Sequence, residues 1–129
     1  ELSELSELDQ MTGLYNKMTT VNKINNRLYE HKNHIGAISV VDMDDFKYIN
    51  DSEGHLIGDH AIRRVSRILK DNFRKEDIIG RIGGDEFVVI VKPEQFIGIS
   101  KIIKNVVALF NTRFIPPIEF VKNTLLFFR

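Results

Sequence analysis

The sequence predicts an α/β fold in which helices pack against a partly antiparallel sheet. Short apolar runs rich in β-branched residues alternate with segments whose apolar residues recur at helical spacing. A Gly-Gly pair separates two of these runs, which is a strong signal for a β-hairpin. From the first predicted strand onward the elements follow the order βαββαβ, which is the ferredoxin-like arrangement of an α+β sandwich.

The first eight residues repeat a Glu-Leu-Ser triplet, and two interpretations of them stay open. Residues 1–8 are either a charged linker or the end of a signalling helix that arrives from an upstream domain. Thr12 and Gly13 then predict a turn. Asn16 is a plausible N-cap for a helix that ends near His31.

A strand and two helices follow. Residues 35–41 are nearly all apolar and rich in β-branched side chains, which is typical of a strand buried on both faces. A short helix is predicted over residues 46–52 and a longer one over residues 57–73. One side of the longer helix is basic, and we interpret it as a solvated surface rather than an anion site. Its members are Arg63, Arg64, Arg67 and Lys70.

The second half of the chain begins with the predicted hairpin. Residues 78–82 and 87–91 are its strands, and the Gly-Gly pair allows a tight turn between them. Pro93 starts a helix that runs through Asn111. A last strand is predicted over residues 124–128, within a tail that is unusually rich in phenylalanine.

Composition excludes several classes of protein. The chain has 129 residues, about one domain, and it contains no cysteine, so a disulfide framework and thiolate metal sites are excluded. Eighteen basic residues balance eighteen acidic ones, which argues against a general affinity for nucleic acid or for an anionic membrane. The apolar runs are far shorter than the roughly 20 residues that span a bilayer, and no signal peptide leads the chain. We therefore expect a cytoplasmic domain.

Three acidic residues lie where the predicted sheet would bring them together. Asp42 follows the first buried strand, whereas Asp85 and Glu86 lie in the hairpin turn. If the first strand pairs beside the hairpin, these carboxylates converge at one edge of the sheet. Mutual repulsion raises the pKa of clustered carboxyls unless a cation lies between them, and Mg²⁺ prefers such oxygen ligands. The alternative is that acidic residues simply populate strand ends and turns.

Several motifs surround these acids. The signature is Gly83-Gly84-Asp85-Glu86-Phe87, and Arg81-Ile82 precedes it. Upstream lie Asp9-Gln10-Met11-Thr12-Gly13-Leu14-Tyr15-Asn16, Asp42-Met43-Asp44-Asp45-Phe46-Lys47, Asn50-Asp51, Gly54-His55 and Gly58-Asp59. In order and spacing, residues 9–111 resemble the GGDEF domain, the catalytic domain of diguanylate cyclases. The resemblance implies a nucleotide-cyclase palm fold.

The resemblance also implies a reaction and a metal site. Family members join two GTP molecules into cyclic di-GMP and release two pyrophosphates, with two domains facing each other in a homodimer. Asp42, the carbonyl of Met43, Asp85 and Glu86 would bind Mg²⁺ (or Mn²⁺). Asp85 or Glu86 would also serve as a catalytic residue that helps to deprotonate the 3′-hydroxyl.

Further residues match the family's nucleotide contacts. Phe46 and Lys47 would lie near the terminal phosphates, whereas Asn50 and Asp59 would read the guanine edge. Gly83 and Gly84 would let the backbone approach the phosphates.

The family also places an inhibitory product site just before its signature. Arg74 and Asp77 match the Arg-x-x-Asp pattern of that site. Arginine can donate to guanine O6 and N7, and a carboxylate can accept from guanine N–H groups. The alternative is a charged connector between a helix and a strand.

Residues 112–129 depart from the family pattern. A Ser-x-Gly motif and a basic Lys-x-x-Gly-Arg stretch that contacts phosphates do not appear. The tail is interpreted as a truncated, frameshifted or divergent end, so we expect weak or absent catalysis and a bare sheet edge.

An inactive module that binds cyclic di-GMP or GTP as a receptor is the alternative function. A dimerisation or RNA-contact module is the third, although the predicted central strands carry one aromatic only. An upstream sensor domain is expected in either of the first two cases.

Overall fold

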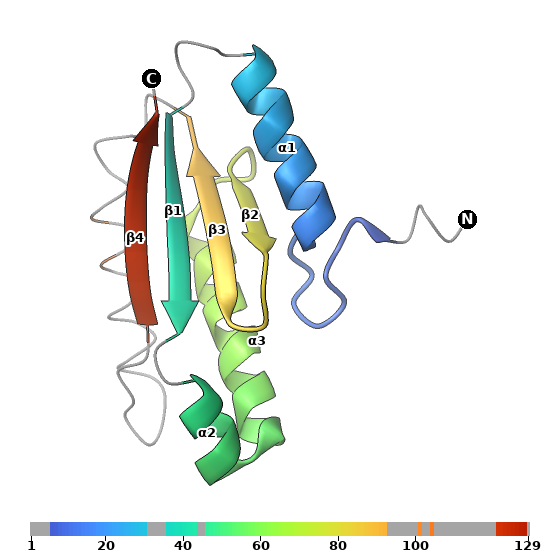
Figure 1. The fold of residues 1–129 in the computed structure, drawn as a ribbon, viewed down its shortest axis with the longest axis vertical. Helices are drawn as coiled ribbons and strands as arrows, with labels where there is room; N and C mark the ends of the chain where they lie inside the picture. Colours follow the sequence, from blue (N-terminus) through green and yellow to red (C-terminus); the bar gives the residue numbers. More distant parts are fainter. Residues whose placement is uncertain are drawn as a thin grey trace.

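The fold is built around a four-stranded sheet with helices on both faces (Figure 1). The computed structural model describes residues 6–30, 36–43, 46–92 and 121–128, together with Lys101 and Lys104. The elements are α1 (Lys17–Glu30), β1 (Gly36–Met43), α2 (Phe46–Glu53), α3 (His55–Asn72), β2 (Ile78–Arg81), β3 (Glu86–Val91) and β4 (Val121–Phe128).

The strands follow the order β2-β3-β1-β4, and every pairing between them is antiparallel. This order confirms the predicted ferredoxin-like arrangement. Each predicted helix and strand before residue 92 is present, with ends that differ by one or two residues for most of them. Most of the predicted helix over residues 93–111 lies outside the described residues, of which Lys101 and Lys104 are helical.

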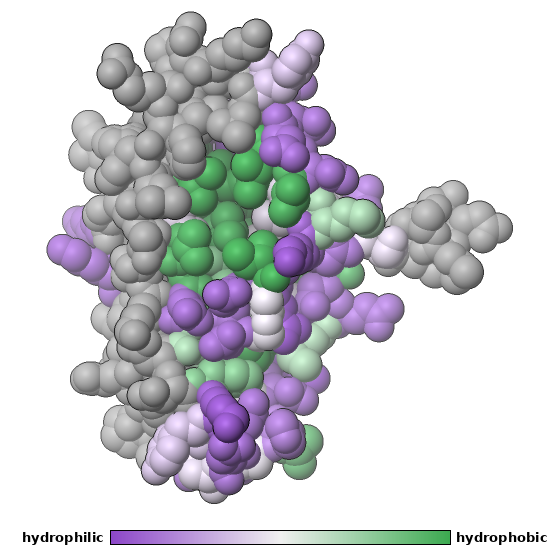
Figure 2. Space-filling model, in the orientation of Figure 1, coloured by the Kyte–Doolittle hydropathy of each residue, from purple (hydrophilic) through white to green (hydrophobic). Residues whose placement is uncertain are grey.

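Alternate residues of the strands face two different hydrophobic clusters. The larger cluster joins one face of the sheet to α2 and α3, and from the strands it contains Val41, Met43, Ile79, Phe87, Val89 and Val91. The smaller cluster lies on the opposite face, where Ile78, Val88 and Ile90 contact Ile24 of α1. Figure 2 shows hydrophobic side chains gathered over the strands beside α1 on this second face. Helix α1 therefore covers part of the face of the sheet opposite to the one that α2 and α3 cover.

Strand β1 is less evenly buried than predicted. Ser39 and Val41, which face α3, are fully buried, whereas Ile38 and Val40 on the α1 side are half-buried. The difference arises because α1 packs along β2 at the edge of the sheet rather than across β1. Burial on both faces, predicted for residues 35–41, is therefore only partly correct for β1, whereas consecutive residues of its neighbour β3, Val88, Val89 and Ile90, are all buried.

The C-terminal strand pairs along the full length of β1. The register runs from Gly36 opposite Phe128 to Met43 opposite Val121, so β4 begins three residues earlier than the sequence predicted. The expected bare edge at this position is wrong, since β4 satisfies the backbone of β1 there.

Helix α1 is attached to the sheet by a close approach between backbone and side chain. The Oδ1 of Asn16 accepts from the Thr19 amide at 2.9 Å, which confirms the predicted N-cap. Thr20, one turn into the helix, is fully buried and its hydroxyl donates to the carbonyl of Asn16 at 2.7 Å. A Cβ built on Gly80 would overlap the Thr20 side chain, so only glycine at this position of β2 lets α1 approach so closely. No described helix is both long enough and apolar enough to cross a membrane.

We expect Gly80→Ala to destabilise the fold by about 1–3 kcal/mol, because the added methyl group must push the buried Thr20 away from β2. Urea unfolding measures this change. Gly84→Ala is the matched control, since a Cβ there meets open space, and its effect should stay within about 0.5 kcal/mol. The double variant Gly80→Ala/Thr20→Ala should recover part of the loss. A Gly80→Ala protein as stable as the wild type would contradict the proposed contact.

Candidate functional site

The three acids singled out in the sequence lie at one end of the β1–β3 pair. Asp42, near the end of β1, is directly opposite Glu86, the first residue of β3. The amide of Met43 donates to the carbonyl of Asp85 at 3.1 Å, which extends the pairing into the turn. The antiparallel register therefore places the end of the first strand beside the hairpin turn.

The charges at this end of the sheet repel one another. Partial burial, followed by the charge of Asp42, raises the pKa of the Asp85 carboxyl, and the charge of Glu86 acts in the same direction. The pattern is that of neighbouring carboxylates that repel one another. Oxygen donors of this kind suit a hard divalent cation such as Mg²⁺.

The third carboxylate points elsewhere. An Oε1 of Glu86 lies 2.5 Å from the position that a Cβ on Gly83 would occupy, so the side chain folds over the turn. Accordingly, within the part of the chain that the structure describes, no three His, Asp or Glu side chains are gathered closely enough to hold a metal ion. The structure thus brings Asp42 and Asp85 into electrostatic contact and leaves Glu86 beside them, turned towards Gly83.

The predicted guanine contacts lie where α2 meets α3. Gly58, in the first turns of α3, is buried, and a Cβ there would overlap the Asn50 side chain of α2. The Oδ1 of Asn50 is buried and has no hydrogen-bond partner among the described residues. Asp59, the next residue, is half-buried and follows the glycine against which Asn50 lies. A buried amide oxygen without a partner is costly, which makes Asn50 unusual for a purely structural residue.

The predicted phosphate contacts differ from each other. Phe46 is half-buried, and its Cζ lies 3.4 Å from the position of a Cβ on Gly58. Lys47 is fully exposed, and its Nζ lies 3.9 Å from a carboxylate oxygen of Asp51 one turn later. The structure therefore leaves Lys47 at the surface, where such a pair contributes little to stability.

Arg74 and Asp77 close a tight turn between α3 and β2. The Arg74 amide donates to Oδ2 of Asp77 at 2.7 Å, and the Asp77 amide donates back to the Arg74 carbonyl at 3.0 Å. Asp77 is only 7% exposed. Burial of the carboxyl and the charge of Glu76 raise the pKa of Asp77, although the Arg74 amide and the charges of Arg74 and Arg27 oppose them.

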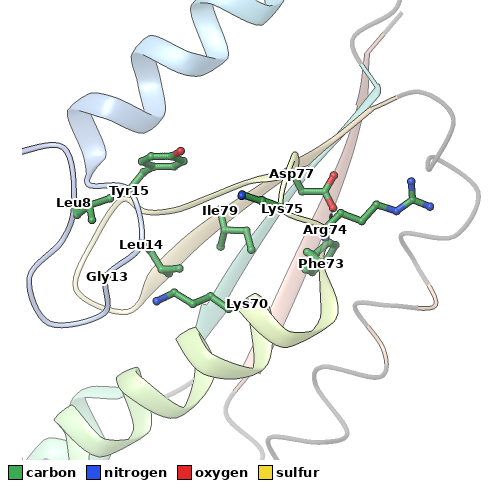
Figure 3. Close-up of a pocket in the computed structure, with 10 residues that line it drawn as sticks. All are labelled: Leu8, Gly13, Leu14, Tyr15, Lys70, Phe73, Arg74, Lys75, Asp77 and Ile79. Atoms are coloured by element: carbon green, nitrogen blue, oxygen red, sulfur yellow. Dashed lines mark hydrogen bonds between the residues drawn. The ribbon is translucent and has the colours of Figure 1, made fainter.

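Two cavities meet at this turn, and Lys75 and Asp77 line both. The first, of about 400 Å³, lies between the turn, the end of α3 and residues 8–15 (Figure 3). Its cationic side chains are Lys70, Arg74 and Lys75. The second, of about 310 Å³, extends towards Lys23, Arg27 and Glu30 of α1 and is also lined by Glu76. A buried carboxylate among basic side chains can accept from N–H groups of a ligand that is itself anionic.

Sequence reasoning missed two residues that organise these sites. Arg81 was noted only as part of a motif, but its guanidinium contacts both the signature turn and Asp9. Lys70 was assigned to a solvated surface, yet its Nζ donates to the carbonyl of Thr12 at 2.9 Å. Of the other members of that basic surface, Arg63 and Arg67 are exposed as expected, whereas Arg64 is half-buried and its Nε is buried, so the prediction is wrong for Arg64. An arginine two residues before the Gly-Gly pair was the available signal for Arg81.

Comparison with known proteins identifies the family. Residues 6–117 match the model of the diguanylate cyclase GGDEF domain. The probable diguanylate cyclase DgcC of Escherichia coli K12 is 40% identical over 92 residues, which are 70% of this chain and 25% of that protein. Diguanylate cyclase DgcS of Shewanella oneidensis is 37% identical over 94 residues, which are 71% of this chain and 32% of that protein. The chain thus spans about a quarter to a third of the length of these curated relatives.

Solved structures agree on the fold. The coiled coil and GGDEF domain of DgcB from Caulobacter crescentus, in complex with c-di-GMP, superposes with a TM-score of 0.85 at 21% identity, over 96% of this chain and 70% of that one. Diguanylate cyclase SiaD of Pseudomonas aeruginosa, in complex with its activator SiaC, gives 0.75 at 26% identity, over 96% of this chain and 50% of that one. The family match over most of the sequence shows that this chain belongs to the GGDEF family of diguanylate cyclase domains.

Proposed function

We propose that this chain is a diguanylate cyclase domain that condenses two GTP molecules into cyclic di-GMP. The observation that carries the proposal is the register of β1 against β3, which sets Asp42 opposite Glu86 and bonds Met43 to the carbonyl of Asp85. The named cyclases among its relatives support the assignment. The family generally uses divalent metals, and Mg²⁺ fits the oxygen donors best.

In the proposed reaction each 3′-hydroxyl loses its proton and its oxygen bonds to the α-phosphorus of the other GTP. The bond from that phosphorus to the bridging oxygen breaks, and pyrophosphate leaves; two such steps close the ring. A divalent ion, when bound, neutralises charge on the phosphoryl oxygens during in-line displacement. Asp42, Asp85 and the carbonyl of Met43 would hold it, joined by Glu86 after its side chain turns away from Gly83. Asp85 or Glu86 would accept the proton from the 3′-hydroxyl.

The base would lie against the junction of α2 and α3. The carboxylate of Asp59 would accept from N1–H and N2–H of guanine, and a guanine N–H would donate to the Oδ1 of Asn50, which has no partner among the described residues. Phe46 and Lys47 would lie near the terminal phosphates, and Gly83 and Gly84 let the backbone approach them. Since each domain holds one GTP, two copies must face each other, and proximity then lowers the barrier.

The proposed extent of the domain is residues 9–111, and the family match extends it to 117. Strand β4 shows that the tail over residues 112–129 supplies part of the sheet. Residues 1–8 would connect to an upstream regulatory part, as in DgcB, whose solved structure includes a coiled coil. We place the domain in the cytoplasm, where GTP is available.

Asp42→Asn and Glu86→Gln should each lower cyclic di-GMP formation at least about 100-fold, because each removes a carboxylate from the proposed metal site. Incubation with GTP and Mg²⁺, followed by chromatography of the products, measures the rate, and a chelator should abolish it. Asp71→Asn, at an exposed position of α3, is the matched control and should leave the rate unchanged. Undiminished product from the Asp42→Asn protein would show that the metal site is misassigned.

The second candidate function is a receptor for cyclic di-GMP, favoured by the buried Asp77 among Arg74 and Lys75. In an active cyclase the same site would mediate product inhibition. Calorimetric titration with cyclic di-GMP should give at least about tenfold weaker binding for Arg74→Ala, because a guanidinium that donates to guanine is lost. Arg63→Ala, on the exposed surface of α3, should bind like the wild type. Binding of cyclic di-GMP without turnover of GTP would establish the receptor function. Equal affinity of Arg74→Ala and the wild type would show that Arg74 is not part of the binding site.

The raised pKa of Asp77 predicts that cyclic di-GMP binding depends on pH. Only the ionised carboxylate accepts from two guanine N–H groups, so affinity is full above the raised pKa and falls as the pH drops through it. Well below that value the affinity should fall about tenfold per pH unit. Titrations between about pH 7 and pH 4 measure the midpoint of the loss.

Glu76→Gln provides the control for this pH dependence. The charge of Glu76 contributes to raising the pKa of Asp77, so its removal should move the midpoint to lower pH. Affinity that stays constant down to pH 4, or a midpoint that moves upward in Glu76→Gln, would contradict the assignment.

A further inference from the structure

The guanidinium of Arg81 contacts two segments that are far apart in the sequence. Its Nη2 donates to the carbonyl of Gly84 at 2.8 Å, and its Nε lies 3.2 Å from the carbonyls of both Gly83 and Gly84. Its Nη1 donates to both carboxylate oxygens of Asp9, at 3.1 and 3.3 Å. The Arg81 side chain is 15% exposed and that of Asp9 is 23% exposed, so the pair is largely shielded from water.

The turn at Gly83 and Gly84 has few contacts of its own that would restrict its conformation. Gly83 and Gly84 carry no side chains, and glycine has the greatest backbone freedom of any residue. Within the turn itself, the amide of Ile82 donates to the carbonyl of Glu86 at 2.9 Å, and that of Gly83 reaches the same oxygen at 3.4 Å. The carbonyls of Gly83 and Gly84 are held by Arg81. The guanidinium therefore adds hydrogen bonds that hold the backbone immediately before Asp85 and Glu86.

Asp9 in turn is held by its own N-terminal turn, residues 9–14. Its Oδ2 accepts from the amide of Thr12 at 3.0 Å and from the Thr12 hydroxyl at 2.7 Å. These bonds and the charge of Arg81 outweigh the opposing effect of burial and hold the pKa of the Asp9 carboxyl below its usual value. A continuous set of hydrogen bonds thus runs from the N-terminal turn through Asp9 and Arg81 to the signature turn.

We propose that Arg81 is a positioning residue that sets the conformation of the acidic signature turn, with Asp9 orienting its guanidinium. The proposal rests on the proposed function in one respect, since a fixed turn matters for catalysis only if Asp85 and Glu86 act there. Displacement of reacting groups by about 1 Å can cost a hundredfold in rate. Because Asp9 and Arg81 connect the two segments, a shift of residues 9–14 would also move the signature turn.

Amide hydrogen exchange tests the positioning without reference to activity. Arg81→Lys keeps the charge, but one ammonium cannot serve the glycine carbonyls and Asp9 in the same fork geometry. We expect the amides of Ile82 and Met43, which donate to Glu86 and Asp85, to exchange at least about tenfold faster relative to Val89 in the middle of β3. A general loss of stability would instead speed all three amides by the same factor.

Two further variants isolate the contacts. Asp9→Asn keeps an oxygen that can accept from Thr12 but removes the charge opposite Arg81, so we expect a smaller acceleration of the same two amides, about threefold. Arg63→Lys makes the same substitution at an exposed position of α3 and should leave both ratios unchanged. Arg81→Lys ratios equal to those of the wild type would overturn the proposal.

Steady-state kinetics adds the functional readout. We expect Arg81→Lys to lower kcat about 10- to 100-fold while KM for GTP changes less than about threefold, because the guanine contacts on α2 and α3 are untouched. If the wild-type chain forms no cyclic di-GMP, the proposed function is wrong, but the hydrogen-exchange data still test whether Arg81 positions the turn. If the wild type is active and Arg81→Lys changes neither the exchange rates nor kcat, only the positioning role of Arg81 is wrong.

Discussion

The antiparallel pairing of β1 with β3 is the constraint on which the rest of this structure depends. The register that sets Asp42 opposite Glu86 also alternates the side chains of both strands between two clusters. A slip of one residue would exchange the two faces and place Phe87 and Val89, now fully buried against α3, on the α1 side. The packing of the larger core therefore fixes where the acidic groups meet, and the chemistry of the site follows from hydrophobic burial rather than from the acids themselves.

Sequence patterns predicted those parts of the fold whose signals are local. Helical periodicity in residues 57–73 and the Asn16 cap were sufficient for α3 and α1, and the Gly-Gly pair was sufficient for the hairpin. The meeting of Asp42 with Asp85 followed from strand order alone. The half-burial of Ile38 and Val40 could not be predicted, because it depends on where α1 lies relative to β1. The same holds for the buried Thr20, whose position against Gly80 is set by a contact between elements 60 residues apart in the sequence.

In the candidate site, too, local sequence predicted some features, whereas others depend on the three-dimensional structure. The residue types at positions 42, 85 and 86 indicated carboxylate chemistry, but the direction of the Glu86 side chain, over Gly83, is a matter of rotamer and turn shape. Arg81 escaped functional interpretation because a single arginine at the end of a strand has no periodicity, and its partner Asp9 lies 72 residues earlier in the sequence. Long side chains that join distant segments leave little trace in local sequence, although they decide how firmly a flexible turn is held.

The place of β4 has a consequence for biosynthesis. Among the strands that the structure describes, the last, β4, pairs with the first, β1, whereas β2 and β3 are neighbours in both sequence and space. During translation the hairpin can form early, but the outer edge of β1 has no partner until residues 121–128 have left the ribosome. An unpaired edge of this kind invites association with other chains. The nascent polypeptide is therefore most exposed to aggregation while the segment between β3 and β4 is being synthesised.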